Sequence, residues 1–218
     1  MKWYEQPPLT TLTDDCKILV FDSETQSSRS VNIGDLKSFV GTPSTQTSGV
    51  KELTFTVDGD NNGLCYFLGT NRSTTIWQNP HNNSLVISAS AIGFGSPQSL
   101  VDRQASEFYT PSDPNSWIKL SIFNGVLKCK YYSLRNRNQN DHYLRTWKLQ
   151  GSNDDSNWTD IDVHTNNTAL NSPSQWLSFP VTSSVAYKHF RLLMTGQNSS
   201  GQHYLCLGEI ELYGTYTY

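Results

Sequence analysis

The sequence predicts an all-β fold, an antiparallel eight-stranded jelly-roll sandwich preceded by a small ββα unit. Three observations support this prediction. Aromatic residues make up 12% of the 218 residues and charged residues only 16%. Asn, Ser and Thr are abundant where helical proteins carry Glu, Lys and Ala, which favours strands and turns. From Lys51 onwards, short apolar runs recur about every ten residues, which is the spacing of a sandwich or barrel.

The N-terminal residues predict a ββα unit that is too small to be stable alone. Asp15 to Asp22 has the apolar pattern of a strand, Ser30 to Ile33 that of a returning strand, and Gly34 to Val40 that of a short helix. Gly41 to Gly49 contains no apolar residue that could anchor it, and it is predicted to be a linker. The predicted organisation is therefore an N-terminal attachment or oligomerisation unit at 1–40, a linker at 41–50 and a β-sandwich at 51–218.

Eight apolar runs after the linker are predicted to be the strands of the sandwich. They are Leu53 to Val57, Leu64 to Leu68, Leu85 to Ala89, Trp117 to Ile122, Lys128 to Leu134, Thr146 to Gln150, Lys188 to Met194, and Cys206 to Tyr213.

Alternation of apolar and polar residues predicts which strand faces are buried. Trp147 to Gln150 alternates between the two types, and so does Glu209 to Tyr213, so each is predicted to have one face in the core and one in water. We expect four large aromatic side chains to be buried, namely Trp117, Trp147, Trp158 and Phe190.

The charge and hydropathy of the chain make two classes of partner unexpected. A net charge of −3 and a pI near 5.9 give no basic surface of the kind that neutralises phosphates, so no nucleic acid is expected. The first residues lack the apolar region of a secretory signal, and no stretch approaches the roughly 18 apolar residues of a membrane helix. We therefore expect a soluble chain without membrane insertion.

The cysteines and histidines show no metal or redox spacing. The four cysteines, Cys16, Cys65, Cys129 and Cys206, form no CxxC pair and are expected to be free, buried thiols. The five histidines show neither HxH nor HExxH spacing, and no GxSxG nucleophile motif is present. We therefore expect no cofactor, no catalytic residues and no enzymatic activity.

One acidic stretch superficially has the pattern of a calcium loop. In Asp58 to Gly63, the carboxylates of Asp58 and Asp60 stand at alternate positions and a glycine follows. The EF-hand spacing fails because no Glu stands at the twelfth position, and a hairpin turn is the better interpretation. A calcium ion held by Asp58 and Asp60 is the alternative.

The C-terminal motifs of the chain resemble those of a known family. Leu144 to Trp158, Tyr187 to Arg191, Gly196 to Leu205 and Gly208 to Gly214 resemble the discoidin-like (coagulation-factor type C) domains, which have a galactose-binding-like fold. They are most similar to the subgroup found beside BTB domains and within HECT-type ubiquitin ligases. The resemblance covers Gly49 to Gly214, and it implies binding through loops at one end of the sandwich. Some domains of this family also hold a structural calcium ion.

The N-terminal unit has a resemblance of its own. Leu9 to Asp15 and Val31 to Lys37 resemble a short segment of bacteriophage tail and virion proteins. This resemblance implies contacts with other virion proteins through residues 1–40, a homotrimer as the assembly state, and location in the virion. The alternative is a hairpin and helix that only cap the sandwich.

Three loops combine Arg, Asn and His with aromatic residues, which suits recognition of hydroxyl or carboxylate groups beside a ring or apolar face. They are Trp77 to Asn82, Arg135 to Tyr143 and Gln197 to Tyr204. In the alternative interpretation, the aromatic residues pack in the core or at its rim and the polar residues form solvated turns. The candidate ligand-binding residues are Trp77, Asn79, His81, Arg135, Asn136, Arg137, Asn138, His142, Tyr143, His203 and Tyr204.

The sequence thus predicts a non-catalytic binding module. The first hypothesis is a phage virion component, of the tail or fibre, that recognises a host-surface glycan or protein. The alternative is an intracellular, cytoplasmic protein-protein interaction module of the ligase-associated type. A third hypothesis, a carbohydrate-binding accessory of a hydrolase, is less favoured because no catalytic domain is present in the sequence.

Overall fold

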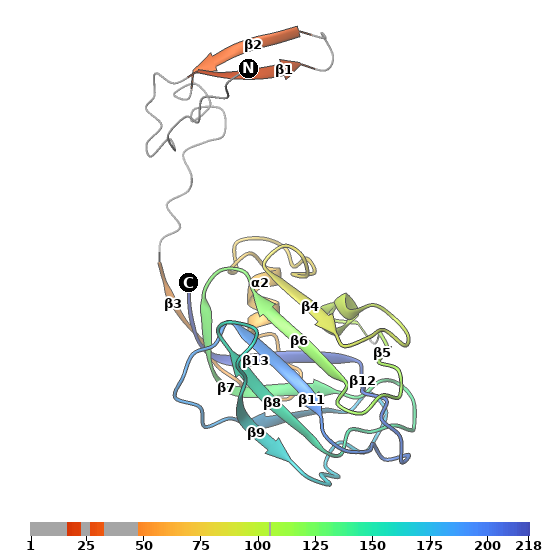
Figure 1. Ribbon diagram of the computed structural model, residues 1–218. Coiled ribbons are helices and arrows are strands. Elements are labelled where there is room, and N and C mark those ends of the chain that lie inside the picture. Colours follow the sequence, from red (N-terminus) through yellow and green to blue (C-terminus); the bar gives the residue numbers. More distant parts are fainter. Residues whose placement is uncertain (1–16, 23–26, 33–47, 105) are drawn as a thin grey trace. The chain divides into compact units, whose positions relative to one another are not determined.

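The computed structural model describes the backbone of residues 17–22 and 27–32, and residues 48–218 except residue 105. The chain divides into two compact units, Met1–Thr47 and Ser48–Tyr218. In the first unit, strands β1 (Lys17–Asp22) and β2 (Ser27–Asn32) form an antiparallel hairpin (Figure 1). β1 falls within the first predicted strand and β2 overlaps the second. The helix predicted at 34–40 lies outside the described residues.

The second unit confirms the predicted all-β sandwich. A four-stranded sheet has the order β10-β7-β13-β3, and a five-stranded sheet has the order β4-β6-β11-β8-β9. All of these pairs are antiparallel, and the two sheets form the layers visible in Figure 1. A third, two-stranded sheet pairs β12 with β5. The strands are β3 (Val50–Leu53), β4 (Leu85–Ala89), β5 (Phe108–Tyr109), β6 (Trp117–Ile122), β7 (Val126–Arg135), β8 (Trp147–Ser152), β9 (Thr159–His164), β10 (Trp176–Pro180), β11 (His189–Met194), β12 (Cys206–Leu207) and β13 (Glu209–Thr217).

The described part of the second unit therefore has eleven strands where eight were predicted. The strands β5, β9 and β10 escaped prediction, and the single run predicted at Cys206 to Tyr213 is divided between β12 and β13. The run predicted at Leu53 to Val57 lies mostly beyond β3. The run predicted at Leu64 to Leu68 is instead the helix α2 (Leu64–Gly69), and a short 3-10 helix, η1 (Pro97–Val101), precedes β5.

The helix α2 forms because a distant carboxylate replaces its N-terminal cap. Gly63 gives no side-chain cap, but Glu211 accepts hydrogen bonds from the backbone N–H groups of Cys65 at 2.7 Å and Tyr66 at 3.1 Å. A Cβ at position 63 would lie 2.3 Å from the side chain of Glu211, so only glycine fits there. A tertiary contact thus overrides the strand preference of this apolar run.

Two of the four aromatic residues predicted to be buried are in the core. Trp147 and Phe190 are almost completely inaccessible. The prediction was wrong for Trp117 and Trp158, which are only half-buried. Trp158 packs under the guanidinium of Arg191, whose Cζ lies 4.3 Å from the ring centroid, so cation-π packing explains an aromatic residue outside the core.

The prediction that β13 has one face in water was also wrong. Glu209 is 2% exposed, and Glu211 and Tyr213 are fully buried. The helix α2 covers Glu211, while Phe55 packs on Tyr213 with ring centroids 5.4 Å apart. The polar side chains in the first half of β13, from Glu209 to Tyr213, are therefore internal.

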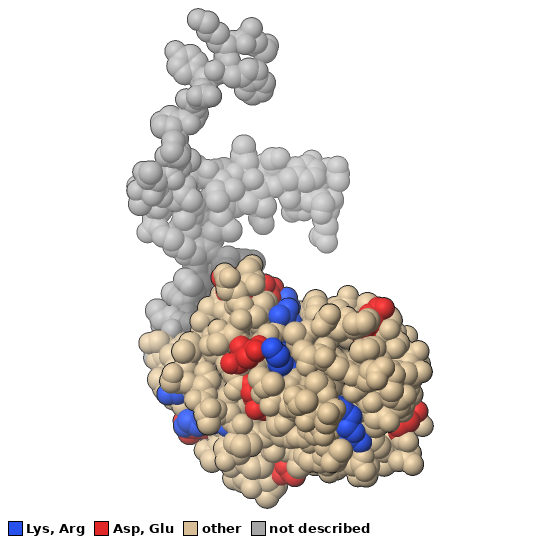
Figure 2. Space-filling view, turned by 60° about the horizontal axis from the view of Figure 1, so that its bottom comes forward, with Lys and Arg blue, Asp and Glu red and all other residues tan. Residues whose placement is uncertain are grey.

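Three of the four thiols fit the sequence prediction. Cys65, Cys129 and Cys206 are free and buried, whereas Cys16 lies outside the described residues. Within the part of the chain that the structure describes, no helix is long and apolar enough to cross a membrane. On the face drawn in Figure 2, the Lys and Arg side chains are few and do not form a continuous basic patch.

Candidate functional site

Two of the three predicted loops meet around one pocket, which we call the loop-end pocket. Its volume is about 330 Å³, and it is lined by Tyr109, Arg137, His142, Gln202, Tyr204 and Cys206. The loops are joined at Tyr143 and Ser199: the backbone N–H of Tyr143 donates to Ser199 Oγ, and the N–H of Ser199 donates to the carbonyl of Tyr143, both at 2.9 Å. The N–H of His142 also donates to Ser200 Oγ at 3.2 Å. These bonds fix the two pocket walls relative to each other.

The buried amide of Asn198 shapes the second loop. Its Oδ1 accepts hydrogen bonds from the N–H groups of Ser200 at 3.0 Å and Gln202 at 3.1 Å, and its Nδ2 donates to the carbonyl of Tyr204 at 3.1 Å. Gly201 takes φ +73°, a left-handed conformation that favours glycine. One side chain, only 5% exposed, therefore positions both Gln202 and Tyr204.

Arg137 is the main charged group of the pocket. Its Nη2 donates to Asp141 and lies 2.9 Å from His142 Nδ1, and its Nη1 lies 3.9 Å from a carboxylate oxygen of Glu107. Burial lowers the pKa of Arg137, but the hydrogen bond to Asp141 and the surrounding negative charges, which include Asp141 and Glu107, together raise it. Arg137 Nε is buried and has no hydrogen-bond partner among the described residues. One guanidinium faces two carboxylates here, so the site does not carry an excess of positive charge.

Two tyrosine rings, those of Tyr109 and Tyr204, also line the pocket. The guanidinium of Arg137 lies 5.4 Å from the ring centroid of Tyr109, and Tyr109 meets Tyr204 edge to face at 5.9 Å. His142 meets Tyr204 in the same way at 5.3 Å, and its Nε2 lies 2.7 Å from Gln202 Oε1. The pocket therefore offers guanidinium, imidazole and amide groups next to apolar ring faces, an arrangement that can bind a hydroxyl or amide beside an apolar group.

Three of the eleven candidate ligand-binding residues line this pocket: Arg137, His142 and Tyr204. Arg135 instead forms an ion pair with Glu209 at 2.8 Å. His203 stands between two lining residues, and its buried Nδ1 has no partner among the described residues.

Three other residues of the Arg135 to Tyr143 loop are structural. Asn136 was expected at the surface but is 2% exposed, because its Nδ2 donates to the carbonyl of Ser172 at 2.9 Å. Tyr143 is 6% exposed and donates its hydroxyl proton to Asn140. Asn138 accepts a hydrogen bond from Ser174 and does not line the pocket.

The third predicted loop, around Trp77, contributes nothing to the loop-end pocket. Asn79 Nδ2 donates to the carbonyl of Gln98 at 3.0 Å, and His81 Nδ1 accepts the N–H of Ile87 at 3.1 Å. Burial lowers the pKa of His81, which suits this acceptor role because the neutral ring is favoured. These side chains organise the connection between α2 and β4.

Three lining residues were missed from the sequence. Tyr109 lies in a two-residue strand without a periodic pattern, and Gln202 looked like one more polar turn residue. Cys206 was assigned to the core as a small hydrophobe. It is indeed 4% exposed, and burial raises its pKa to about 12, so it offers the pocket a neutral thiol surface.

The stretch Asp58 to Gly63, predicted to be a turn with calcium binding as the alternative, contains a turn in which the oxygens of Gly59 and Asp60 are already engaged. Asp60 accepts hydrogen bonds from the N–H groups of Thr56 at 2.8 Å and Asn62 at 2.9 Å. The guanidinium of Arg103 donates to the carbonyls of Gly59 and Asp60, and it lies 3.6 Å from Glu211. The described residues contain no group of three or more His, Cys, Asp or Glu side chains placed to hold a metal ion.

Residues 84–208, more than half of the chain, match the F5/8 type C domain. The chain belongs to this family. Three curated relatives cover about three-quarters of it. The ubiquitin ligase Ufd4 of Drosophila melanogaster is 31% identical over 172 residues (74% of this chain), and hecd-1 of Caenorhabditis elegans is 33% identical over 172 (75%). A BTB/POZ domain-containing protein of Arabidopsis thaliana is 31% identical over 182 residues (77%). The matched regions make up only 6%, 6% and 22% of these proteins.

Solved structures show the same fold. A CBM32 domain from Clostridium perfringens, in complex with GalNAc-β-1,3-galactose, has a TM-score of 0.51 at 13% identity and covers 60% of this chain and 95% of that one. The lectin domain of Lectinolysin, complexed with Lewis B antigen, has a TM-score of 0.50 at 14% identity and covers 63% and 96%. The chain is therefore a discoidin-type domain with a galactose-binding-like jelly roll.

Proposed function

We propose that the chain is a non-catalytic, intracellular protein-interaction module that recognises a neutral polar group of its partner in the loop-end pocket. The observation that carries this proposal is the convergence of two distant loops on Arg137, His142 and Gln202 beside two tyrosine rings. The relatives at 31–33% identity are ubiquitin ligases and a BTB protein, which favours a protein partner in the cytoplasm.

The charges around the pocket narrow the choice of ligand group. Asp141 and Glu107 already neutralise Arg137, so a carboxylate entering the pocket would meet two negative charges. A side-chain amide or hydroxyl has no such repulsion, and it can form a hydrogen bond with the side-chain amide of Gln202 in the pocket lining. An Asn, Gln, Ser or Thr side chain next to an apolar residue fits these features.

A glycan is the second candidate, because the same donors and ring faces suit sugar hydroxyls. The phage virion hypothesis, with host-surface attachment through the sandwich and a homotrimer assembled through residues 1–40, gains no support from the relatives. It stays a prediction.

The test uses two glutamines of the same loop. Gln202 lines the pocket, while Gln197 is exposed and makes no side-chain hydrogen bond to the described residues. The full chain would be screened against a yeast-displayed random peptide library and against a glycan array. We expect enriched peptides rich in amide and hydroxyl residues, whose affinity falls at least tenfold in Gln202→Ala and is unchanged in Gln197→Ala.

Binding to the glycan array alone, with the same dependence on Gln202, would replace the protein partner with the second candidate. Equal effects of the two substitutions, or no binding to either set of probes, would refute recognition at this pocket.

A further inference from the structure

A second pocket, also of about 330 Å³, follows the outer edge of the four-stranded sheet, and we call it the edge groove. Four consecutive residues, 51–54, form one wall, and residues of α2 and of the turn after β3 form the other. It shares no residue with the loop-end pocket. Its lining is Lys51, Glu52, Leu53, Thr54, Thr56, Asn61, Asn62, Tyr66, Phe67 and Ser73.

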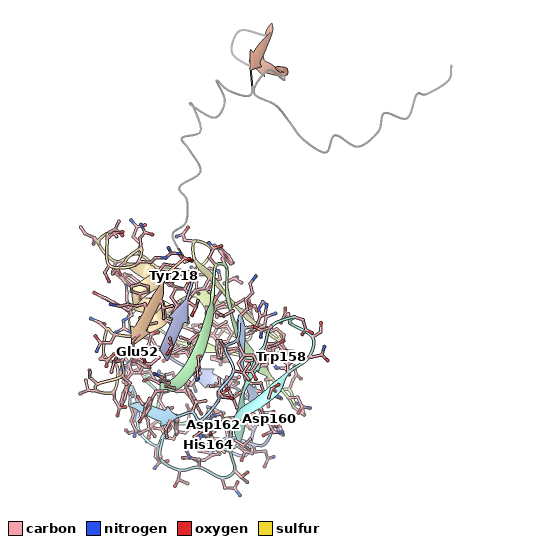
Figure 3. All side chains as sticks on the ribbon, turned by 90° about the vertical axis from the view of Figure 1, so that its left-hand side faces the viewer. Glu52, Trp158, Asp160, Asp162, His164 and Tyr218 are labelled. Carbon is pink, nitrogen blue, oxygen red and sulfur yellow. The ribbon has the colours of Figure 1, made fainter. Side chains whose placement is uncertain are left out.

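The strand beside this groove has only one neighbour. β3 is the last strand of its sheet and pairs with β13 alone. Figure 3 shows Glu52 and Tyr218 on the side of the sandwich where these two strands lie together. Gly49 and Tyr218 exchange both of their backbone hydrogen bonds, at 2.6 and 2.9 Å. In an antiparallel pair, residues that bond to the neighbouring strand alternate with residues that do not. Lys51 and Leu53 therefore also bond to β13, and Glu52 directs its N–H and C=O away from the sheet.

The side chains of β3 alternate between two environments. Leu53 is 3% exposed, and the Nζ of Lys51 lies 5.8 Å from the ring centroid of Phe67, so these two face α2 and the groove. Glu52 points to the other face, where it bonds to Lys130 and Thr215 at 2.7 Å each. Glu52 is thus compensated, while Lys51 makes no ion pair with any described residue.

We propose that an extended segment of a partner protein adds to β3 as a fifth strand, using the free N–H and C=O of Glu52. Strand addition takes its affinity from main-chain hydrogen bonds and its specificity from alternate side chains. We expect the residue of the partner strand opposite Lys51 to be acidic, because the ammonium group of Lys51 has no ion pair among the described residues. The side chain opposite Leu53, two positions away, is apolar and contacts Phe67 in the groove.

A second copy of this chain fits the edge less well. Two of the registers that hydrogen-bond parity allows pair most of β3 with β3 of a second copy. One places Glu52 opposite Glu52 of the other copy, and the other places Lys51 opposite Lys51. Like charges directly opposite each other destabilise a strand pair.

The test compares Glu52→Pro with Glu52→Ala in the full chain. Both substitutions remove the carboxylate and its bonds to Lys130 and Thr215. Only proline also removes the outward N–H, and it leaves the bonds between β3 and β13 intact. The probe is a yeast-displayed library of random eight-residue peptides, sorted on wild-type chain. We expect peptides with an acidic and an apolar residue two positions apart, bound at least tenfold more weakly by Glu52→Pro than by Glu52→Ala.

Two further measurements keep the result independent of whether the proline variant folds. Lys51→Glu should change the acidic preference of the selected peptides to a basic one. The peptide that binds the wild-type chain would also be N-methylated at one residue at a time. Methylation at every second residue should abolish binding, and methylation at the residues between them should leave it unchanged.

Three results would overturn the proposal: no enriched peptide, equal binding by the proline and alanine variants, or N-methylation effects without alternation. A dimer that light scattering detects for Glu52→Ala but not for Glu52→Pro would assign the edge to a second copy instead. If Gln202→Ala abolishes binding of these peptides and Glu52→Pro does not, the peptides bind in the loop-end pocket. The two sites can therefore be tested separately.

Discussion

The hydroxyl of Tyr132 offers a sharp test of the core. It is fully buried, accepts the indole N–H of Trp147 at 2.9 Å and donates to Asp162 at 2.7 Å. Tyr132→Phe keeps the ring and leaves no cavity of consequence, so its cost comes from hydrogen bonding. An orphaned buried N–H costs about 1–3 kcal/mol. Asp162 keeps a 2.7 Å contact with His164, so its own loss is smaller. We expect unfolding free energy to fall by about 2–3 kcal/mol, most of it through Trp147.

Urea unfolding followed by circular dichroism measures this change. A double-mutant cycle then shows how much of it comes from the hydrogen bond between Tyr132 and Trp147. In a Trp147→Phe background the indole donor is already absent, so Tyr132→Phe should cost only about 1 kcal/mol there. Tyr131, on the same strand and 36% exposed, provides the matched control, and Tyr131→Phe should change stability by less than about 0.5 kcal/mol. Equal costs of Tyr132→Phe in the two backgrounds would refute the coupling between the hydroxyl and the indole.

Four further predictions follow from other parts of the fold. Asn136→Ala should destabilise the chain by about 1 kcal/mol in urea unfolding, because it removes the hydrogen bond that this buried amide donates to the carbonyl of Ser172. Asn198→Ala should weaken binding of the selected peptides at least as much as Gln202→Ala does, since it releases the loop that carries Gln202; unchanged binding would show that the loop keeps its shape without the amide. Burial raises the pKa of Glu209 to about 7 from 4.5, although Arg135 opposes this shift. Between these two pKa values the folded chain holds a proton that the unfolded chain has lost. The free energy of unfolding should therefore fall by at most about 3 kcal/mol as pH rises from 4.5 to 7. Thermal melts across this pH range should show a smaller dependence on pH for Glu209→Gln. Residues 48–218 alone should unfold at the same urea concentration as the full chain if the two units are independent; a lower midpoint would show that the first unit supports the sandwich.

Much of the sandwich could be predicted because apolar residues at alternate positions of β4, β6, β8 and β11 are buried, and the apolar runs marked these strands closely. Strict alternation holds only in β11, because Ser121 of β6 and Gln150 of β8 are buried as well. The rule failed where tertiary contacts decide the outcome. Glu211 looked solvent-facing because a carboxylate is costly to bury, yet it caps α2 and turns an apparent strand into a helix.

The candidate site was predictable only as two loops. Polar and aromatic composition pointed to Arg137, His142 and Tyr204, but composition does not say which side chain a loop turns inward. Asn136 and Arg137 are neighbours with similar polarity, and only one of them lines the pocket. Tyr109 could not be found at all, because its place in the wall depends on the pairing of β5 with β12 across almost a hundred residues of sequence.

The positively charged side chain of Arg103 holds together the turn that follows β3. Its guanidinium donates to two carbonyls of that turn and faces Glu211, which in turn holds the start of α2. The charge is part of a side chain, so it is in place as soon as the polypeptide folds. The edge groove is built on the same turn and helix, and its shape should therefore be the same in compartments that differ widely in free divalent ions.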